Sequence, residues 1–80
     1  MNNVNVSLYN GVLNVNTGID SCNVCVMSTL DSGGSIYSVS NNVNSVTLDS
    51  VNTSVTVCIT RIGYVPYLVE ISPYIYIQDH

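Results

Sequence analysis

Apolar and polar residues alternate along most of the chain, in short runs that turn-forming residues separate. Residues 4–8 alternate Val and Leu with Asn and Ser, which is the period-two pattern of a β-strand with one buried face. Asn10-Gly11 follows, and this dipeptide favours the positive φ angles of a tight hairpin turn. Residues 13–16 alternate again and stop before Gly18. The first 18 residues therefore predict a β-hairpin.

The middle of the chain predicts two more strands. Residues 22–27 are apolar at both sets of alternating positions except Asn23, so we expect this third strand to be buried on both faces, as a central strand is. Asp31-Ser32-Gly33-Gly34 is a turn sequence, after which residues 36–39 predict a short fourth strand. Asn41-Asn42 is expected to break the chain again.

The last third of the chain has the clearest strand pattern. Residues 46–48 predict a fifth strand, and residues 55–62 predict a sixth, with Val and Ile on one face and Thr and Cys on the other. Residues 64–71 predict an edge strand, because Pro66 lacks the amide hydrogen that a central ladder position needs. Pro73 separates a final extended piece, residues 74–77.

These segments predict an all-β fold, a small antiparallel β-sandwich of about seven strands, since turn signals recur about every 8 to 12 residues and no helical pattern intervenes. Composition agrees, because Val, Ile and Thr total 27 residues and the good helix formers Leu, Met, Gln, Glu and Arg total 10. With 80 residues there is one domain. We place the sandwich in residues 1–72, and a tail or the start of a connection to a following domain in residues 73–80.

Charge and hydropathy exclude two classes of function. Arg61 is the only Lys or Arg residue and the net charge is -4, so no basic stripe exists to neutralise phosphates and we expect no nucleic-acid binding. No apolar run exceeds four residues, whereas a membrane-spanning helix needs about 20. We therefore expect no membrane insertion.

Three cysteines raise the questions of metal, redox chemistry and disulfides. Cys22 and Cys25 have the spacing of a zinc half-site, but residues three apart on a strand point to opposite faces, so the two sulfurs should diverge. We expect no metal site and interpret the cysteines mainly as small apolar residues. If the protein is exported, one disulfide can join Cys58 to Cys22 or to Cys25, which leaves one thiol free.

No catalytic or cofactor site is expected either. His80 is the only imidazole and is the last residue, so a Ser or Cys nucleophile has no credible general base. Glu70 has no acidic residue near it in the sequence, and Asp79 follows only after Pro73, so the sequence predicts no paired-carboxylate site of the kind that glycosidases use. The loops that carry Asp20, Asp31 and Asp49 could offer oxygen ligands to Ca²⁺ if two of them met at one end of the sandwich, but turn formation is the favoured interpretation.

Tyrosine is the most suggestive residue type. Of six tyrosines, four cluster near the C-terminus, at positions 64, 67, 74 and 76. Exposed tyrosines on an edge strand suit a protein or glycan surface, so Tyr64, Tyr67, Tyr74 and Tyr76 form a candidate interaction surface. The alternative is that Tyr fills the core, because the chain has no Phe or Trp.

Residues 54–71, SVTVCITRIGYVPYLVEI, and residues 73–80, PYIYIQDH, carry a family resemblance. They resemble the end of the immunoglobulin-like domain that follows the catalytic domain in gingipain-type cysteine peptidases of Bacteroidetes-type bacteria. In that family a basic or amide-rich segment usually precedes Tyr-x-Pro-Tyr, and here residues 61–63 stand in that place. A related sandwich, the carboxypeptidase regulatory-like module, shares the ending of the sixth strand and is the alternative for the fold.

The resemblance implies an immunoglobulin-like fold and a non-catalytic accessory or interaction module of a larger secreted or cell-surface protein, with neighbouring domains as partners. It carries no catalytic residue onto this chain. A free-standing adhesin or filament subunit that assembles by pairing of exposed β-edges is the alternative function. An enzyme would need a pocket lined by convergent polar groups.

Overall fold

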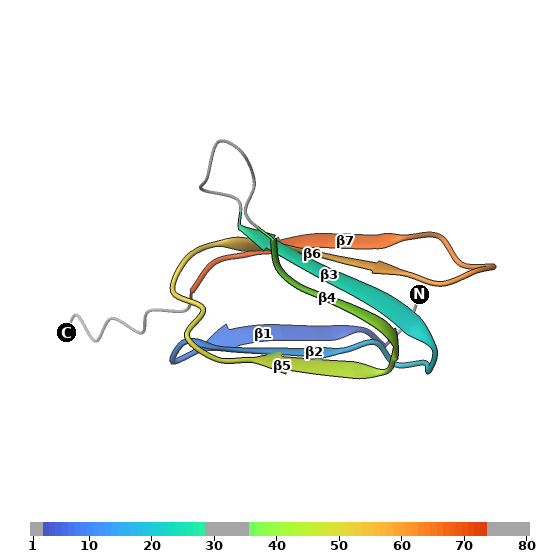
Figure 1. The fold of residues 1–80 in the computed structure, drawn as a ribbon, viewed down its shortest axis with the longest axis horizontal. Coiled ribbons are helices and arrows are strands. Elements are labelled where there is room, and N and C mark those ends of the chain that lie inside the picture. The colour runs from blue at the N-terminus through green and yellow to red at the C-terminus, as the bar shows by residue number, and fades with distance from the viewer. Residues whose placement is uncertain (1–2, 29–35, 74–80) are drawn as a thin grey trace.

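The computed structural model describes residues 3–28 and 36–73. Seven strands form two antiparallel sheets that face each other (Figure 1). The strands are β1 (Asn5–Tyr9), β2 (Val12–Asn16), β3 (Cys22–Ser28), β4 (Ile36–Val43), β5 (Ser45–Leu48), β6 (Val55–Thr60) and β7 (Tyr67–Ile71). One sheet has the order β1-β2-β5 and the other has the order β4-β3-β6-β7. The predicted all-β fold with seven antiparallel strands is confirmed.

The hairpin of β1 and β2 follows directly from its turn residues. Tyr9 pairs with Val12, so Asn10 and Gly11 are the two loop residues. Their φ angles are +53° and +78°, and positive values at both central positions define the type I′ turn, whose twist matches that of the strands. The Gly11 carbonyl also accepts a hydrogen bond of 2.8 Å from the amide of Val51, which ties the hairpin tip to the segment between β5 and β6.

β4 differs from the expectation, because it continues through Asn41 and Asn42 to Val43. The sequence was expected to break at these two asparagines, and that prediction was wrong. Cys22 pairs with Val43 and Val24 pairs with Ser40, so three steps along β4 match two along β3. Asn42 has a φ of +61°. The asparagines form a β-bulge, which bends a strand and keeps it in the sheet.

The connection from β6 to β7 is longer than the sequence predicted. β6 ends at Thr60, not at Ile62, and β7 begins at Tyr67, directly after Pro66. The amide of Tyr64 donates a 3.0 Å hydrogen bond to the carbonyl of Arg61. Gly63 has a φ of +90° at the third position of this turn, as a type II turn requires. β7 is an edge strand, as Pro66 indicated.

The core lies between the sheets and is almost entirely aliphatic. Inward-facing residues pair in rows, such as Val6, Val15 and Val46 in one sheet and Val26, Val57 and Val69 in the other. The buried core residues are Leu8, Leu13, Val15, Cys22, Val24, Val26, Val46, Val51, Val55, Val57 and Ile59. β3 is central in its sheet as predicted, but its outward side chains Cys25 and Met27 are half-buried and Asn23 is exposed.

The strand order differs from that of a constant-type immunoglobulin domain in the position of β4. A constant-type immunoglobulin domain places its fourth strand beside the fifth, in the sheet of the first two strands. Here β4 pairs with β3 instead. The sheet that contains β1 and β2 therefore has three strands and the other has four, whereas in the constant-type domain the first sheet has four and the second has three. β4 and β7 thereby become the edges of the larger sheet.

Candidate interaction surfaces

The outer face of the three-stranded sheet is uncharged and mainly polar, with Tyr9 and Val12 paired at its hairpin end. Ser7, Asn14 and Thr47 form one row across its strands, and Asn5, Asn16 and Ser45 form the next. The hydroxyl of Thr47 donates a 3.1 Å hydrogen bond to Oδ1 of Asn14. These groups suit solvent, because each exposed amide or hydroxyl can also bind water.

The outer face of the four-stranded sheet is apolar at its centre. Val39 of β4 pairs with Cys25 of β3, Cys25 pairs with Cys58 of β6, and Cys58 pairs with Leu68 of β7. We call these four residues the cross-sheet row. Val39 is 59% exposed and Leu68 is 67% exposed, and the two cysteines between them are half-buried. A continuous apolar row therefore crosses all four strands.

A second outward row lies next to the cross-sheet row. Ile36, Met27, Thr56 and Glu70 pair in that order across the same strands. Ile36 is 63% exposed and Met27 is half-buried, so the apolar area extends toward the β4 side. Glu70 gives this face a charge at the β7 edge.

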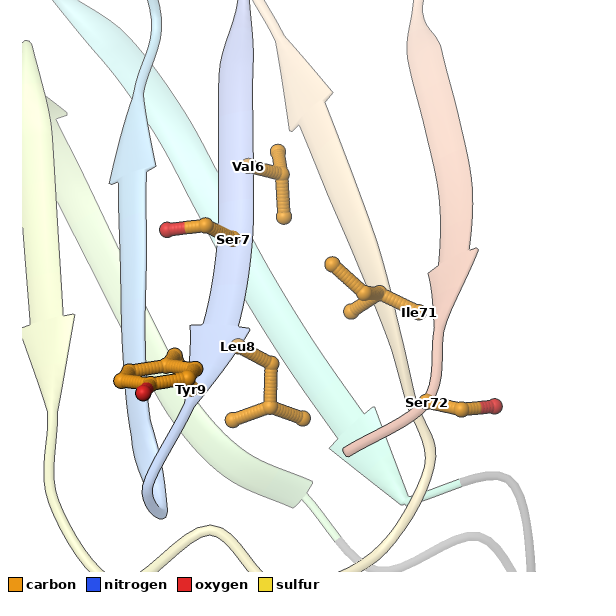
Figure 2. Close-up of a pocket in the computed structure, with 6 residues that line it drawn as sticks. All are labelled: Val6, Ser7, Leu8, Tyr9, Ile71 and Ser72. Carbon is orange, nitrogen blue, oxygen red and sulfur yellow. The ribbon is translucent and has the colours of Figure 1, made fainter. Parts of the chain in front are cut away.

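A groove opens between β1 and β7, where the edges of the two sheets meet (Figure 2). Its volume is about 450 Å³. Val6 and Leu8 of β1 and Ile71 of β7 point into it, whereas Ser7 and Tyr9 point away. Ser72 completes the lining. None of the six residues that line the groove is charged.

The two described tyrosines of the predicted surface have different surroundings. Tyr67 packs partly against the core, so it supplies aromatic filling. Tyr64 is 44% exposed and lies under the guanidinium of Arg61, whose Cζ is 5.3 Å from the ring centroid. Tyr74 and Tyr76 lie outside the described residues. The structure places Tyr64 and Tyr67 on the same β6–β7 hairpin, and the interaction surface predicted from the four tyrosines stays a prediction.

The β6–β7 hairpin tip carries Arg61, which is the only Lys or Arg residue of the chain. Besides the stacking on Tyr64, a guanidinium nitrogen of Arg61 lies 3.7 Å from a carboxylate oxygen of Asp20. Ile62 and Val65 of the tip are 98% and 78% exposed. Arg61 thus contacts both the tip and the β2–β3 connection, and the side chains of Ile62 and Val65 beside it are exposed to solvent.

The cysteines lie on two different faces of the four-stranded sheet. Cys22 is fully buried in the core, and its Sγ lies 3.6 Å from the carbonyl oxygen of Ile19. Cys25 and Cys58 oppose each other on the outer face. All three are free thiols. Of the two disulfide partners left open for Cys58, the register places Cys25 beside it and Cys22 on the other side of the sheet.

The acidic loops do not converge in the part of the chain that the structure describes. Asp20 is paired with Arg61, Asp49 follows β5, and Asp31, Asp79 and His80 lie outside the described residues. Residues 3–28 and 36–73 contain no group of three or more His, Cys, Asp or Glu side chains with metal-binding geometry. Within the same ranges, no helix has the length and hydropathy to cross a membrane.

Comparisons with protein-family models, curated proteins and solved structures find no significant match to this chain. The fold supports the β-sandwich implied by the resemblance to gingipain-associated domains, and the family membership itself stays a prediction.

Sequence reasoning missed the cross-sheet row. Each of its members was visible as an outward position of its own strand, but the row exists only when three strand pairs are in register. The available signal was the occurrence of apolar residues on both faces of residues 22–27.

Proposed function

We propose that this chain is a non-catalytic accessory module of a larger secreted or cell-surface bacterial protein, and that the outer face of its four-stranded sheet packs against a neighbouring domain of the same polypeptide. The observation that carries the proposal is the contrast between the two outer faces. One face presents Asn, Ser and Thr, with Tyr9 and Val12 at one end, whereas the other presents the cross-sheet row. An exposed apolar strip that runs across a whole sheet is typical of a surface that another surface covers.

The size of the face favours a tethered partner. The four strands have five to eight residues each, and strands about 4.8 Å apart with a rise of about 3.3 Å per residue give a face of about 400 Å². Stable complexes between separate proteins bury about 800 Å² per partner. Contacts between domains of one chain are smaller, about 600 to 1,500 Å² in total, and the covalent link raises the effective concentration. The face is large enough for a linked domain and small for a free one.

The sheet edges argue against assembly by β-edge pairing, which is the alternative function. β5 has four residues, β4 contains two register shifts, and β7 follows Pro66 directly. Short strands, bulges and prolines are the features by which natural sheets prevent edge-to-edge pairing. Of the four edge strands, only β1 lacks all three of these protective features.

Light scattering of the isolated chain separates the two functions. We expect a monomer across a wide concentration range, for the wild type and for Leu68→Asp. The matched control is Asn14→Asp, on the polar face of the other sheet and on its central strand β2. A stable dimer that Leu68→Asp abolishes and Asn14→Asp preserves would contradict the tethered-domain proposal and would support assembly of separate copies.

A further inference from the structure

We infer that Cys25 and Cys58 form a redox modification site, in which thiol–disulfide exchange with a small disulfide such as oxidised glutathione converts the two thiols into a reversible cross-strand disulfide. The inference applies to the outer face while it is open to solvent, as it is in the 80-residue chain, because a neighbouring domain docked there as proposed above would close access to the two thiols. It goes beyond the proposed function, because it assigns chemistry to a surface otherwise described only by its shape and polarity.

The register of β3 and β6 places the two residues directly opposite each other. Six consecutive pairs, from Asn23–Thr60 to Ser28–Val55, run without a shift, so the Cys25–Cys58 pair is held on both sides by regular pairing. Residues opposite each other on antiparallel strands have Cα atoms about 4.5 to 5.5 Å apart. Disulfides bridge Cα atoms about 4.4 to 6.8 Å apart. The backbone therefore already has the spacing that the bond needs.

The Cβ atoms must still approach each other. Cross-strand Cβ atoms are about 4.5 to 5.5 Å apart, and in a disulfide they are about 3.5 to 4.5 Å apart. The midpoints of these two ranges differ by about 1 Å; an approach of that size stores strain, and strained or exposed disulfides are the easily reduced ones. The bond is thus expected to form and to be reversible.

Cys22 cannot replace either partner in the folded protein. It is fully buried on the inner face, where its Sγ lies 3.6 Å from the Ile19 carbonyl oxygen and 3.8 Å from that of Asp20. Cys25 and Cys58 are half-buried and open to the solvent side of the sheet, between the exposed side chains of Val39 and Leu68. A small disulfide reaches the outer pair and does not reach Cys22.

The exchange balances in two steps. The thiolate of one cysteine attacks a sulfur of glutathione disulfide, forms a mixed disulfide and releases one glutathione thiolate. The thiolate of the second cysteine then attacks the protein sulfur of the mixed disulfide and releases the second glutathione. Cys25 and Cys58 together lose two electrons and two protons, and one glutathione disulfide becomes two glutathione thiols. The direct opposition of the pair makes the second step intramolecular and fast.

The test is oxidation of the reduced, folded chain by oxidised glutathione, followed by alkylation and peptide mass mapping. We expect a Cys25–Cys58 bond, with Cys22 alkylated only after denaturation. Cys25→Ser and Cys58→Ser lack the second attacking thiol, so each is expected to accumulate about tenfold more glutathione adduct than the wild type. Cys22→Ala is the matched control and keeps the bond.

A second readout is the thermal midpoint. A Cys25–Cys58 bond closes the long segment between these two residues and so restricts the unfolded chain. The oxidised chain is therefore expected to melt on the order of 10 °C higher than the reduced chain. A bond that includes Cys22, or glutathione adducts that persist on Cys25 or Cys58 of the wild type, would overturn the inference. These outcomes are read on the wild-type chain and do not require that any variant folds.

Discussion

The amide of Thr17 donates a 3.1 Å hydrogen bond to the carbonyl of Asn44, and the Thr17 hydroxyl lies 3.1 Å from the same oxygen. The hydroxyl also contacts the carbonyl oxygen of Ile19. Thr17 is fully buried, although it follows β2 in a connection between the sheets. One threonine thereby holds the β2–β3 connection against the residue that separates β4 from β5.

Replacement of Thr17 by Val tests this connection. Valine has nearly the same shape but no hydroxyl, so the carbonyl oxygen of Ile19 loses its contact with that hydroxyl and the carbonyl of Asn44 keeps only the Thr17 amide as a donor. The free energy of unfolding should therefore fall by about 1 to 2 kcal/mol. Urea denaturation measures the change. The control is Thr47→Val, which removes an exposed hydroxyl that bonds to Asn14 and should change stability by about 0.5 kcal/mol or less. Equal losses in the free energy of unfolding for the two variants would contradict the claim that the buried position of Thr17 makes its hydroxyl more stabilising.

Gly11→Ala should destabilise the hairpin turn more than Gly63→Ala destabilises the β6–β7 turn. Both glycines have positive φ angles, +78° and +90°, which cost a residue with a Cβ about 1 to 2 kcal/mol. At Gly11 the added Cβ would also lie 3.3 Å from Oδ1 of Asn52, whereas at Gly63 nothing lies within 4 Å. Thermal melting of both variants gives the comparison. A larger loss of stability for Gly63→Ala than for Gly11→Ala would contradict the claim that the close approach of Asn52 makes position 11 the more sensitive one.

Truncation of one buried and one exposed aliphatic residue in the four-stranded sheet should show how differently the core and the outer face contribute to the free energy of unfolding. Ile59 is fully buried and Leu68 is 67% exposed. Ile59→Ala should lower the free energy of unfolding by about 2 to 5 kcal/mol, because it removes buried contacts and leaves a cavity. Leu68→Ala should cost about 0.5 kcal/mol. A large loss for Leu68→Ala in the isolated chain would mean that the cross-sheet row serves stability and not binding.

Removal of the ion pair between Arg61 and Asp20 should have little effect. Asp20 is 82% exposed and Arg61 is 31% exposed, and exposed pairs contribute about 0 to 1 kcal/mol. Asp20→Asn is therefore expected to change the thermal midpoint by only a few degrees, and less so at high salt. Tyr64→Leu removes the ring on which Arg61 stacks and serves as the comparison. A loss for Asp20→Asn that persists in high salt would contradict a screened surface pair.

The sequence predicted the strands better than their ends or neighbours. Alternation located the hairpin at Asn10-Gly11 and the inward face of β6, because burial imposes a period of two. It failed at Asn41-Asn42, since the same residue types form both turns and bulges. Only pairing partners distinguish the two.

The candidate site was harder to predict than the fold. The sequence left Cys58 with two equivalent partners, since either Cys22 or Cys25 could be near it. The choice depends on the offset of β6 against β3, and a shift by one residue would have put Cys58 on the inner face. The cross-sheet row requires two further offsets, of β4 and of β7, and no single strand contains that information.

The most direct test of the central claim is hydroxyl-radical footprinting of the outer face, in the isolated 80-residue chain and in the longer polypeptide that the proposal requires. Val39, Leu68 and Met27 should lose most of their labelling in the longer polypeptide. Tyr9, which is 57% exposed in the other sheet, should be labelled equally in both. Protection of the cross-sheet row with unchanged labelling of Tyr9 is the predicted result. Equal labelling of the row in both samples would contradict the claim that a neighbouring domain covers this face.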